Sequence, residues 1–308
     1  MEVLYLILLN VIFPVFALIG VGAFLHRRFL FDLNTLSKLS TFLLLPAVSF
    51  VNIYQSSISG DVLLTVIGFL LLQNLCLMII CSGTSKAFGF EPGISATFKN
   101  SVVLKNSGNF GLPVSQLVFQ DNPLGLSIQV IVLIFQNLLT YTYGLINSVA
   151  VKTNGWQAVK EFLKIPILYA LIIGLLLNRF EVPIPFFIWT PIETISNSFL
   201  AIALITLGAQ SAIIKITKFS LPLTLSLFGR LILSPILAFT IITLLKLDGT
   251  TAQALLIASS FPSSRNSALF ALEYNNHPEY AAQAVILSTL FSSVTVTGVV
   301  YLAGVLYG

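Results

Sequence analysis

The chain has 308 residues, of which 56% are hydrophobic and only 8% are charged. A soluble domain usually carries about a quarter charged residues, so this composition excludes an ordinary soluble protein. The net charge of +4 does not indicate nucleic-acid binding, because the basic residues are scattered singly at the ends of apolar runs and form no patch. The length fits about ten membrane spans of about 20 residues each, joined by short loops.

Apolar runs between polar breaks predict ten helices. Those of the first half cover residues 4–25, 36–56, 62–82, 94–119 and 124–149. Those of the second half cover residues 164–180, 187–213, 219–245, 250–274 and 279–306. The polar connection between the halves is predicted to be a linker. The sequence thus predicts an all-α polytopic membrane protein with the domains 1–150, 151–163 and 164–308.

Basic residues predict the direction in which the helices cross the membrane. Two lie in loops of one side, Arg179 and Lys246. Ten lie in or beside loops of the other side: Arg27, Arg28, Lys38, Lys86, Lys99, Lys152, Lys160, Lys164, Lys215 and Lys218. Cytosolic loops carry an excess of Lys and Arg. We therefore expect a multi-pass protein of the cell (inner) membrane with a cytosolic linker and both termini outside the cytosol.

Five spans per half place the second half in the opposite orientation to the first, which predicts inverted repeats. A weak internal similarity supports them, because FPVFALIGVGAFLHRRF in the first predicted helix matches IPILYALIIGLLLNRF in the sixth. The fourth and ninth predicted helices are each interrupted, at NSGNFGLP and at FPSSRNSA. Interruptions at corresponding positions of two repeats are typical of the binding site of a transporter.

The two interruptions oppose a regular helix. Glycine costs about 1 kcal/mol relative to alanine inside a helix, and proline about 3 kcal/mol. Gly108, Gly111 and Pro113 interrupt the fourth helix and Pro262 the ninth, so each is predicted to be two half-helices near the bilayer midplane, with Pro113 opening the second of the first pair. The serines around Pro262 are candidate helix caps. Irregular backbone at this depth is tolerated only inside protein or beside a cavity.

Charge predicts which substrate such a site would accept. Lys105 and Arg265 stand beside the two breaks, whereas all eleven acidic residues lie at or near the ends of predicted spans. A cation in mid-membrane costs at least about 2.5–3.5 kcal/mol, so it normally faces the interior and serves transport. The N-terminal ends of the second half-helices would also attract an anion. The sequence therefore favours an anionic substrate. A third embedded cation, Arg230, is expected to have a structural role.

Two motifs resemble the auxin efflux carrier family, which includes plant PIN proteins and bacterial carriers for malate, malonate and similar acids. Asn106 stands seven residues before Pro113, with Gly111 between them, as in the family's N-x4-G-x-P pattern. Pro262 is followed by ALFALEYNNHP, which closes the ninth predicted helix. The resemblance implies ten helices, with 4 and 9 crossing, helices 1, 2, 6 and 7 as a scaffold, and 3–5 with 8–10 as a transport domain that moves by an elevator mechanism.

The sequence departs from plant members in two respects. Their long cytosolic loop is reduced here to about a dozen residues, so its regulation is not carried over. Their helix 9 break has no arginine, and Arg265 therefore favours a smaller and more highly charged acid over an indole-type acid. We expect a mono- or dicarboxylate such as malate, or an auxin-like acid, between the crossing and helices 2 and 7. The expected substrate-binding residues are Lys105, Asn106, Asn109, Arg265, Ser263, Ser264, Asn266, Asn52, Asn197 and Gln210.

A secondary transporter has three alternatives: a cation-coupled symporter, an enzyme, and a channel or sensor. A cation-coupled symporter of the bile-acid type, driven by sodium or protons, shares the broken-helix plan, and sodium-dependent uptake would reveal it. An enzyme would need a nucleophile, base or metal cluster, and the two histidines, His26 and His277, are remote from each other. Composition leaves a channel or sensor open. We expect a non-enzymatic protein without cofactor, metal or nucleic acid, whose partners are a small organic anion and the bilayer; a homodimer stays open.

Overall fold

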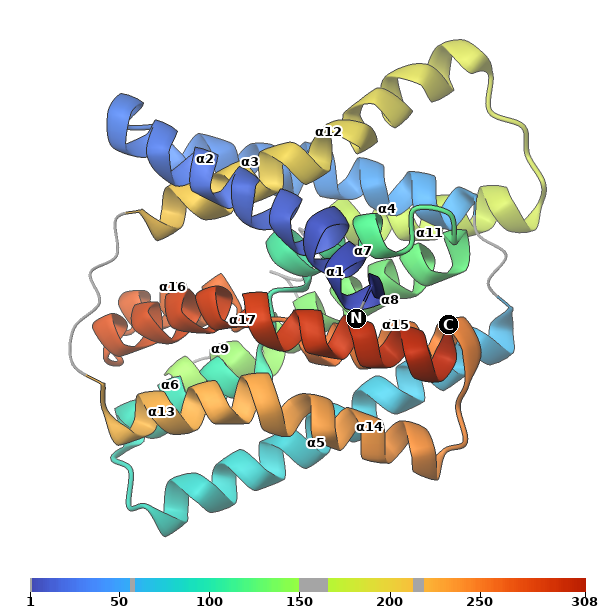
Figure 1. Cartoon of the computed structure of the whole chain (residues 1–308). Helices are drawn as coiled ribbons and strands as arrows, with labels where there is room; N and C mark the ends of the chain where they lie inside the picture. The colour runs from blue at the N-terminus through green and yellow to red at the C-terminus, as the bar shows by residue number, and fades with distance from the viewer. Residues whose placement is uncertain (1, 56–58, 150–165, 213–218) are drawn as a thin grey trace.

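The computed structural model describes residues 2–55, 59–149, 166–212 and 219–308, and it shows them as a bundle of helices (Figure 1). Over these ranges the only β pairing is one isolated bridge of two residues. The predicted linker 151–163 lies outside the described residues, as do the predicted helix ends at 164 and 213.

The first half of the chain contains several continuous helices that include short π-helical turns. Its elements are α1 (Glu2–Ile7), η1 (Leu8–Ile12), α2 (Phe13–Phe29), α3 (Leu33–Leu39), η2 (Ser40–Leu44), α4 (Leu45–Tyr54), α5 (Gly60–Ala87), α6 (Pro92–Val103), η3 (Ser107–Gly111), α7 (Leu112–Val118), α8 (Pro123–Leu139), η4 (Thr140–Gly144) and α9 (Leu145–Val149).

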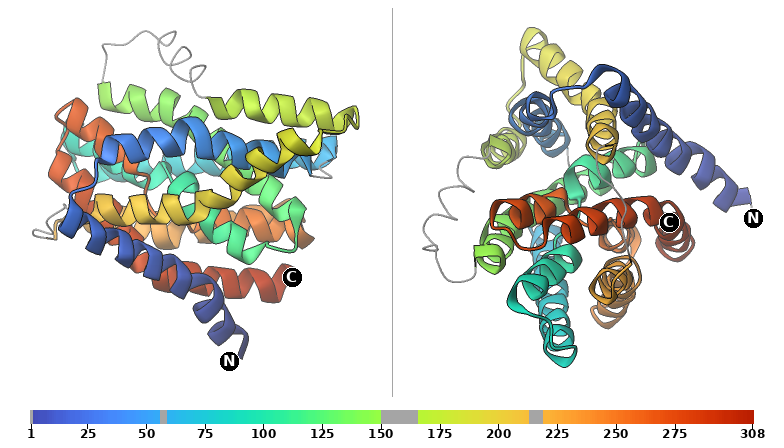
Figure 2. Two further views of the ribbon diagram at one scale, coloured as in Figure 1. Left: turned by 90° about the horizontal axis from the view of Figure 1, so that it is seen from above. Right: turned by 90° about the vertical axis from the view of Figure 1, so that its left-hand side faces the viewer.

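The second half has the same character. Its elements are α11 (Pro166–Arg179), α12 (Phe186–Ser211), α13 (Leu221–Phe228), η5 (Gly229–Leu233), α14 (Ser234–Leu244), α15 (Gly249–Ser259), α16 (Arg265–Glu273) and α17 (Pro278–Tyr307). Most helices run roughly parallel, as the end-on view of Figure 2 shows.

Most predicted helix ends agree with these bounds to within a few residues, and α5 shows the largest difference. It continues to Ala87, past the predicted end at residue 82. Residues 83–86 are polar or glycine, and the sequence pattern therefore predicts a loop there. The hydroxyl of Thr84 instead donates to the carbonyl of Ile80 at 2.9 Å, so the helix itself satisfies this polar group.

Among the described residues, seven stretches are long and apolar enough to cross a membrane: Tyr5–Phe29, Leu33–Tyr54, Gly60–Ala87, Pro123–Ser148, Phe186–Ser211, Leu221–Leu244 and Pro278–Tyr307. Of the three remaining predicted spans, 94–119 and 250–274 are each divided by a break. The third is represented by the shorter apolar helix Pro166–Arg179, which begins next to residues outside the described ranges. The count of ten spans and the inverted repeats stay predictions.

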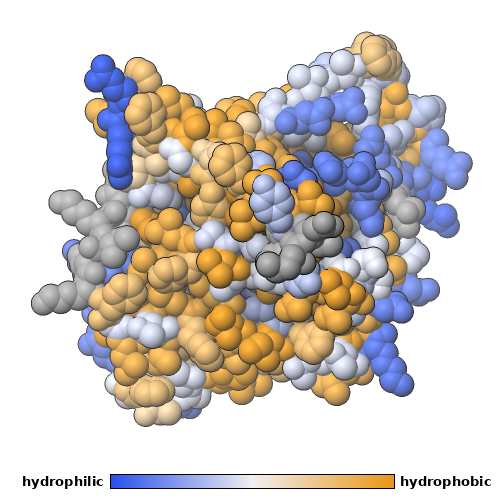
Figure 3. Space-filling model, viewed as in Figure 1, coloured by the Kyte–Doolittle hydropathy of each residue, from blue (hydrophilic) through white to orange (hydrophobic). Residues whose placement is uncertain are grey.

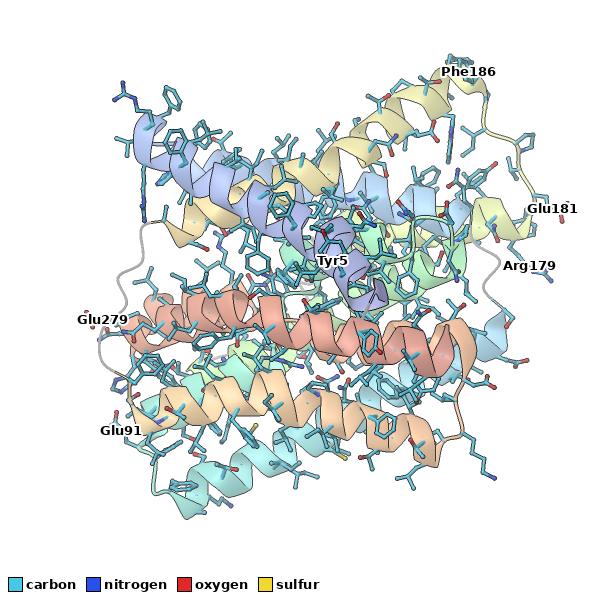
Figure 4. The ribbon with its side chains drawn as sticks, in the orientation of Figure 1. Tyr5, Glu91, Arg179, Glu181, Phe186 and Glu279 are labelled. Atoms are coloured by element: carbon cyan, nitrogen blue, oxygen red, sulfur yellow. The ribbon has the colours of Figure 1, made fainter. Side chains whose placement is uncertain are left out.

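Polar residues gather at two opposite ends of the bundle. Glu91 and Glu279 lie at one end, and Arg179 and Glu181 lie at the other (Figure 4). Between these ends, apolar residues cover most of the face shown in Figure 3. An apolar belt between two polar ends is what a hydrocarbon core with water on both sides requires, so the chain is a multi-pass membrane protein.

Helices from the two halves of the chain pack against each other. α2 packs along α12, and α4 packs along both α11 and α12. Gly22 of α2 and Gly208 of α12 lie where the first pair touches: a Cβ on Gly22 would collide with the backbone of Ile205, and one on Gly208 with that of Ile19. Small residues allow this close approach, because helix association in lipid relies on van der Waals packing.

Candidate functional site

The two interrupted segments cross at the centre of the bundle and pair there. Lys105 and Ser263 form an antiparallel bridge. On either side of it, the amide of Asn106 donates to the carbonyl of Pro262 at 2.8 Å, and the amide of Ser264 donates to the carbonyl of Leu104 at 2.7 Å. Each segment thus satisfies backbone groups that the other leaves open, as a low-dielectric interior demands.

The break in the first segment lies earlier than the sequence predicts. α6 ends at Val103, Leu104 is extended, and the chain turns helical again at Ser107, the start of η3. Pro113 therefore stands in the first turn of α7, which continues η3, and does not itself open the half-helix. The cause is tertiary, because the extended residues are those that pair with the second segment.

Gly108 and Gly111 both lie within η3. At Gly111 the reason for glycine is a close approach: a Cβ there would collide with the aromatic ring of Phe261, which belongs to the other broken segment. The same ring meets Phe110 edge-on, with centroids 6.2 Å apart. Glycine at this position lets the two broken segments pack against each other.

The second segment restarts with a capped helix. Residues 260–264 are not helical and contain Pro262, and α16 begins at Arg265. Ser264 is its N-cap, since its hydroxyl oxygen accepts a hydrogen bond from the amide of Asn266 at 3.2 Å. The sequence prediction of a serine cap is confirmed here. The helix end presents amide groups and a partial positive charge to its surroundings.

A cavity of about 120 Å³ lies beside the crossing, enough for several waters or one small acid. Its wall comes from both broken segments and from helices α3–α4, α8–α9 and α11. The lining residues are Thr41, Leu45, Lys105, Asn106, Ser107, Gly108, Asn109, Leu133, Gln136, Asn137, Thr140, Tyr141, Ile167, Ser264, Arg265 and Asn266.

The charges of this lining are all of one sign. Lys105 and Arg265 are cations, and no carboxylate of the described residues lines the cavity. Lys105 is 3% exposed, and its ammonium has no hydrogen bond or ion pair within the described part of the chain. Arg265 donates from Nη1 to the hydroxyl of Ser37 at 2.8 Å. Burying an uncompensated cation is costly, so a positive charge at this depth calls for solvent or a negative charge to offset it.

Several buried polar atoms of the lining also lack a partner among the described residues: Asn106 Nδ2, Ser107 Oγ and both amide atoms of Gln136. Gln136 is only 3% exposed. Buried polar groups are normally hydrogen-bonded, so these atoms require water or a ligand in the cavity. Donors next to two cations suit a carboxylate.

The structure brings six of the predicted binding residues together in this lining: Lys105, Asn106, Asn109, Ser264, Arg265 and Asn266. It places the other four elsewhere. Ser263 donates to the carbonyl of Ser101 at 2.6 Å, and Asn52 donates to Val48 of its own helix at 2.8 Å. Asn197 is exposed, and Gln210 donates to the hydroxyl of Ser37 at 3.3 Å.

Sequence reasoning missed the contribution of the fifth predicted helix. Gln136, Asn137, Thr140 and Tyr141 line the cavity, whereas the predicted site draws only on the two breaks and on scaffold amides of other helices. A signal was present: these four polar residues recur at helical spacing within an otherwise apolar run and so share one helix face. Polar residues within a span normally face the interior.

A second hollow, of about 340 Å³, shares Arg265 with the first. Its wall includes Leu33, Gln210 and Pro278, and two of these residues begin helices at the end of the bundle that also holds Glu279 (Figure 4). Arg265 therefore stands between the crossing and that end. Among the described residues, no group of three His, Cys, Asp or Glu could hold a metal ion.

Comparison with known proteins gives two matches. A family described as "Membrane transport protein" matches residues 7–162 and 148–300. An "Uncharacterized transporter" from Methanothermobacter thermautotrophicus is 23% identical over 301 residues, which cover 96% of this chain and 94% of that protein. The matched residues include both broken segments and the whole lining of the cavity.

Proposed function

Because the chain belongs to the membrane transport protein family, the auxin efflux carrier family of the sequence resemblance, we propose that it is a secondary transporter for a small organic anion. The substrate is a mono- or dicarboxylate such as malate, bound in the cavity beside the crossing. The observation that carries this proposal is a buried cavity lined by two cations and, among the described residues, by no carboxylate. The protein acts by transport, without catalysis or a cofactor.

The binding mode follows from the chemistry of the lining. The guanidinium of Arg265 can grip a carboxylate through two parallel hydrogen bonds, and Lys105 supplies a compact charge. Asn106, beside the first break, and Gln136, of α8, add neutral donors. The partial positive charge at the start of α16 adds to the attraction for an anion.

An elevator motion fits the packing of the helices. α2, the continuous helix from α3 to α4, α11 and α12 pack together and form the proposed scaffold. The crossing belongs to the remaining helices, the proposed transport domain. Arg265 contacts the scaffold through the hydroxyl of Ser37, so one charged side chain touches both proposed domains at the substrate cavity. The proposed orientation places the end with Glu91 and Glu279 in the cytosol.

Membrane potential favours export of such a substrate. An inside-negative potential acts on each uncompensated charge with about 2.3 kcal/mol per 100 mV. A uniporter for anions therefore runs outward. A co-transported sodium ion or proton would change this direction, and a sodium and pH dependence of the flux would reveal a symporter.

The test is uptake of radiolabelled malate and related acids by proteoliposomes. Lys105→Gln and Arg265→Gln should each reduce transport by about 10–100-fold, the effect of losing one charge-assisted hydrogen bond. Lys246→Gln and Arg179→Gln are matched controls, because both residues are exposed and distant from the cavity. Undiminished uptake by the Lys105 and Arg265 variants would contradict the assignment of the site.

A further inference from the structure

Arg230 is a third buried cation, and it does not line the substrate cavity. It lies in the π-helical turn η5 and is 1% exposed. Its guanidinium reaches the backbone of both broken segments. It donates from Nη1 to the carbonyl of Val102 at 2.7 Å and from Nη2 to the carbonyl of Ser259 at 2.5 Å.

These two carbonyls belong to the last turns of α6 and α15, where the first half-helix of each broken segment stops. The last four carbonyls of a helix have no partner within it and carry a partial charge of about −0.5. Two such ends together amount to about one negative charge. The single positive charge of Arg230 matches it.

Ser234 strengthens the same arrangement. Its hydroxyl accepts a hydrogen bond from Nη2 of Arg230 and donates one to the carbonyl of Ser259 at 2.9 Å. The end of α15 is therefore held by two donors that also contact each other. The planar fork of an arginine can span the two helix ends at once, whereas a lysine ammonium is a point charge.

The position of these carbonyls in the chain gives them their importance. Val102 precedes Lys105 by three residues, and Ser259 precedes Ser263 by four. Lys105 and Ser263 are the two residues of the central bridge. Arg230 thus fixes the backbone immediately before each bridging residue, and with it the place of the Lys105 ammonium in the cavity.

We propose that Arg230 is a positioning residue for substrate binding: it clamps the ends of α6 and α15 and so sets the geometry of the crossing. The partial negative charges of the two helix ends offset the charge of Arg230. Lys105 and Arg265 are then the cations that face the anion. The inference rests on the proposed function for its effect on substrate, but its effect on the crossing does not depend on which substrate is carried.

The first experiment measures the crossing directly by hydrogen exchange of the purified protein. Arg230→Lys keeps the charge and loses the fork. Exchange in peptides that contain the amides of Asn106 and Ser264 should accelerate about tenfold, while peptides from the middle of α12 stay unchanged. Unchanged exchange at the crossing would overturn the inference. Arg179→Lys, at an exposed position, is the matched control.

The second experiment separates positioning from stability through malate uptake in proteoliposomes. A displaced Lys105 weakens binding, so Arg230→Lys should raise KM about tenfold and change Vmax less than twofold. A merely structural role lowers the amount of folded carrier, so Vmax would fall at constant KM, and that result would contradict the inference. Absence of uptake of any acid by the unaltered protein would instead refute the proposed function and leave the exchange result to decide on Arg230.

Ser234→Ala covers the case in which Arg230→Lys fails to fold. It leaves both carbonyl bonds of Arg230 in place and removes one hydroxyl, which accepts from Nη2 of Arg230 and donates to the carbonyl of Ser259. Exchange at the crossing should then accelerate about two- to threefold, in the same peptides. No acceleration in this variant would also overturn the inference.

Discussion

Arg265 and Ser37 are joined across 228 residues of sequence by a hydrogen bond of 2.8 Å, from the guanidinium Nη1 to the hydroxyl oxygen. The same hydroxyl accepts from Gln210 at 3.3 Å and donates to the carbonyl of Leu33 at 2.7 Å. A bound anion must therefore compete with Ser37 for this cation. The strength of that contact enters the affinity of the site.

Ser37→Ala should tighten the binding of malate about 3–10-fold, because the net worth of a hydrogen bond is about 0.5–1.5 kcal/mol. Titration calorimetry on the purified protein measures the change. Ser198→Ala is a suitable control, since that hydroxyl bonds only to the carbonyl of Thr194 in its own helix. Unchanged or weaker binding in Ser37→Ala would show that the contact does not restrain Arg265.

Gln136→Leu should stabilise the protein and weaken its binding. Both amide atoms of Gln136 are buried and have no partner in the described part of the chain, and leaving such a group unsatisfied costs about 1–3 kcal/mol. Leucine removes that cost and also removes the donor that faces the anion. We expect a higher Tm together with an affinity for malate about tenfold lower.

The control for this variant is Gln116→Leu. The Gln116 side-chain oxygen is also buried without a partner, but the residue does not line the cavity. Its Tm should rise while its affinity stays constant. A Gln136→Leu protein that binds malate as tightly as the unaltered chain would exclude this glutamine from the site.

Gly208→Ala should destabilise the protein by about 1–3 kcal/mol, the usual cost of overpacking. The added methyl group would collide with the backbone at Ile19, which cannot move without separating α2 from α12. Gly298→Ala in α17 is the opposite case, because nothing lies within 4 Å of its added Cβ. Alanine there should stabilise by up to about 1 kcal/mol. Thermal unfolding in detergent compares the two, and equal Tm values would contradict the close packing.

We expect the protein to lose stability in acid through the protonation of Asp32. Its carboxylate accepts from the hydroxyl of Thr35 at 2.5 Å and from the amide of Asn34 at 3.0 Å, and these bonds lower its pKa below the usual 3.8. A carboxylate whose pKa is lowered by folding stabilises above its unfolded pKa, and the contribution is lost as the pH falls through the folded pKa. Because Asp32 is exposed, salt screens the effect.

Asp32→Asn keeps an acceptor at the start of α3 and does not titrate. Between pH 6 and pH 3, its Tm should therefore fall less than that of the unaltered protein. Asp248→Asn serves as the control, since Asp248 precedes α15 without a side-chain capping bond. If Asp32→Asn and the unaltered chain lose the same Tm, the cap does not contribute to the acid response.

Local chemistry explains which parts of the site the sequence could predict. Pro262 and the serines around it oppose a helix wherever they stand, so the second break was predictable and Ser264 caps the new helix as expected. Leu104 and Lys105 have no such local signal. They are extended because the amide of Ser264 donates to the carbonyl of Leu104 and the amide of Asn106 donates to that of Pro262. The partners are more than 150 residues apart in sequence, so no local pattern contains this information.

The direction in which a polar side chain points within a span cannot be predicted from the sequence either. Asn52 and Gln136 are both amides in apolar helices. Asn52 bonds to its own helix at Val48, whereas Gln136 points its unpaired amide at the cavity side of α8. The difference depends on which neighbouring helix covers each face, and that is decided by packing between the two halves of the chain.

The close approach of α2 and α12 at Gly22 and Gly208 has a consequence for biosynthesis. The two residues are 186 positions apart (208 minus 22), so α12 leaves the ribosome about 10–40 s after α2 at a synthesis rate of about 5–20 residues per second. During that interval the glycine face of α2 lacks the helix that covers it. Until then α2 lies in the bilayer without this packing partner, and a chain that ends early leaves a helix with an uncovered face for quality control to detect.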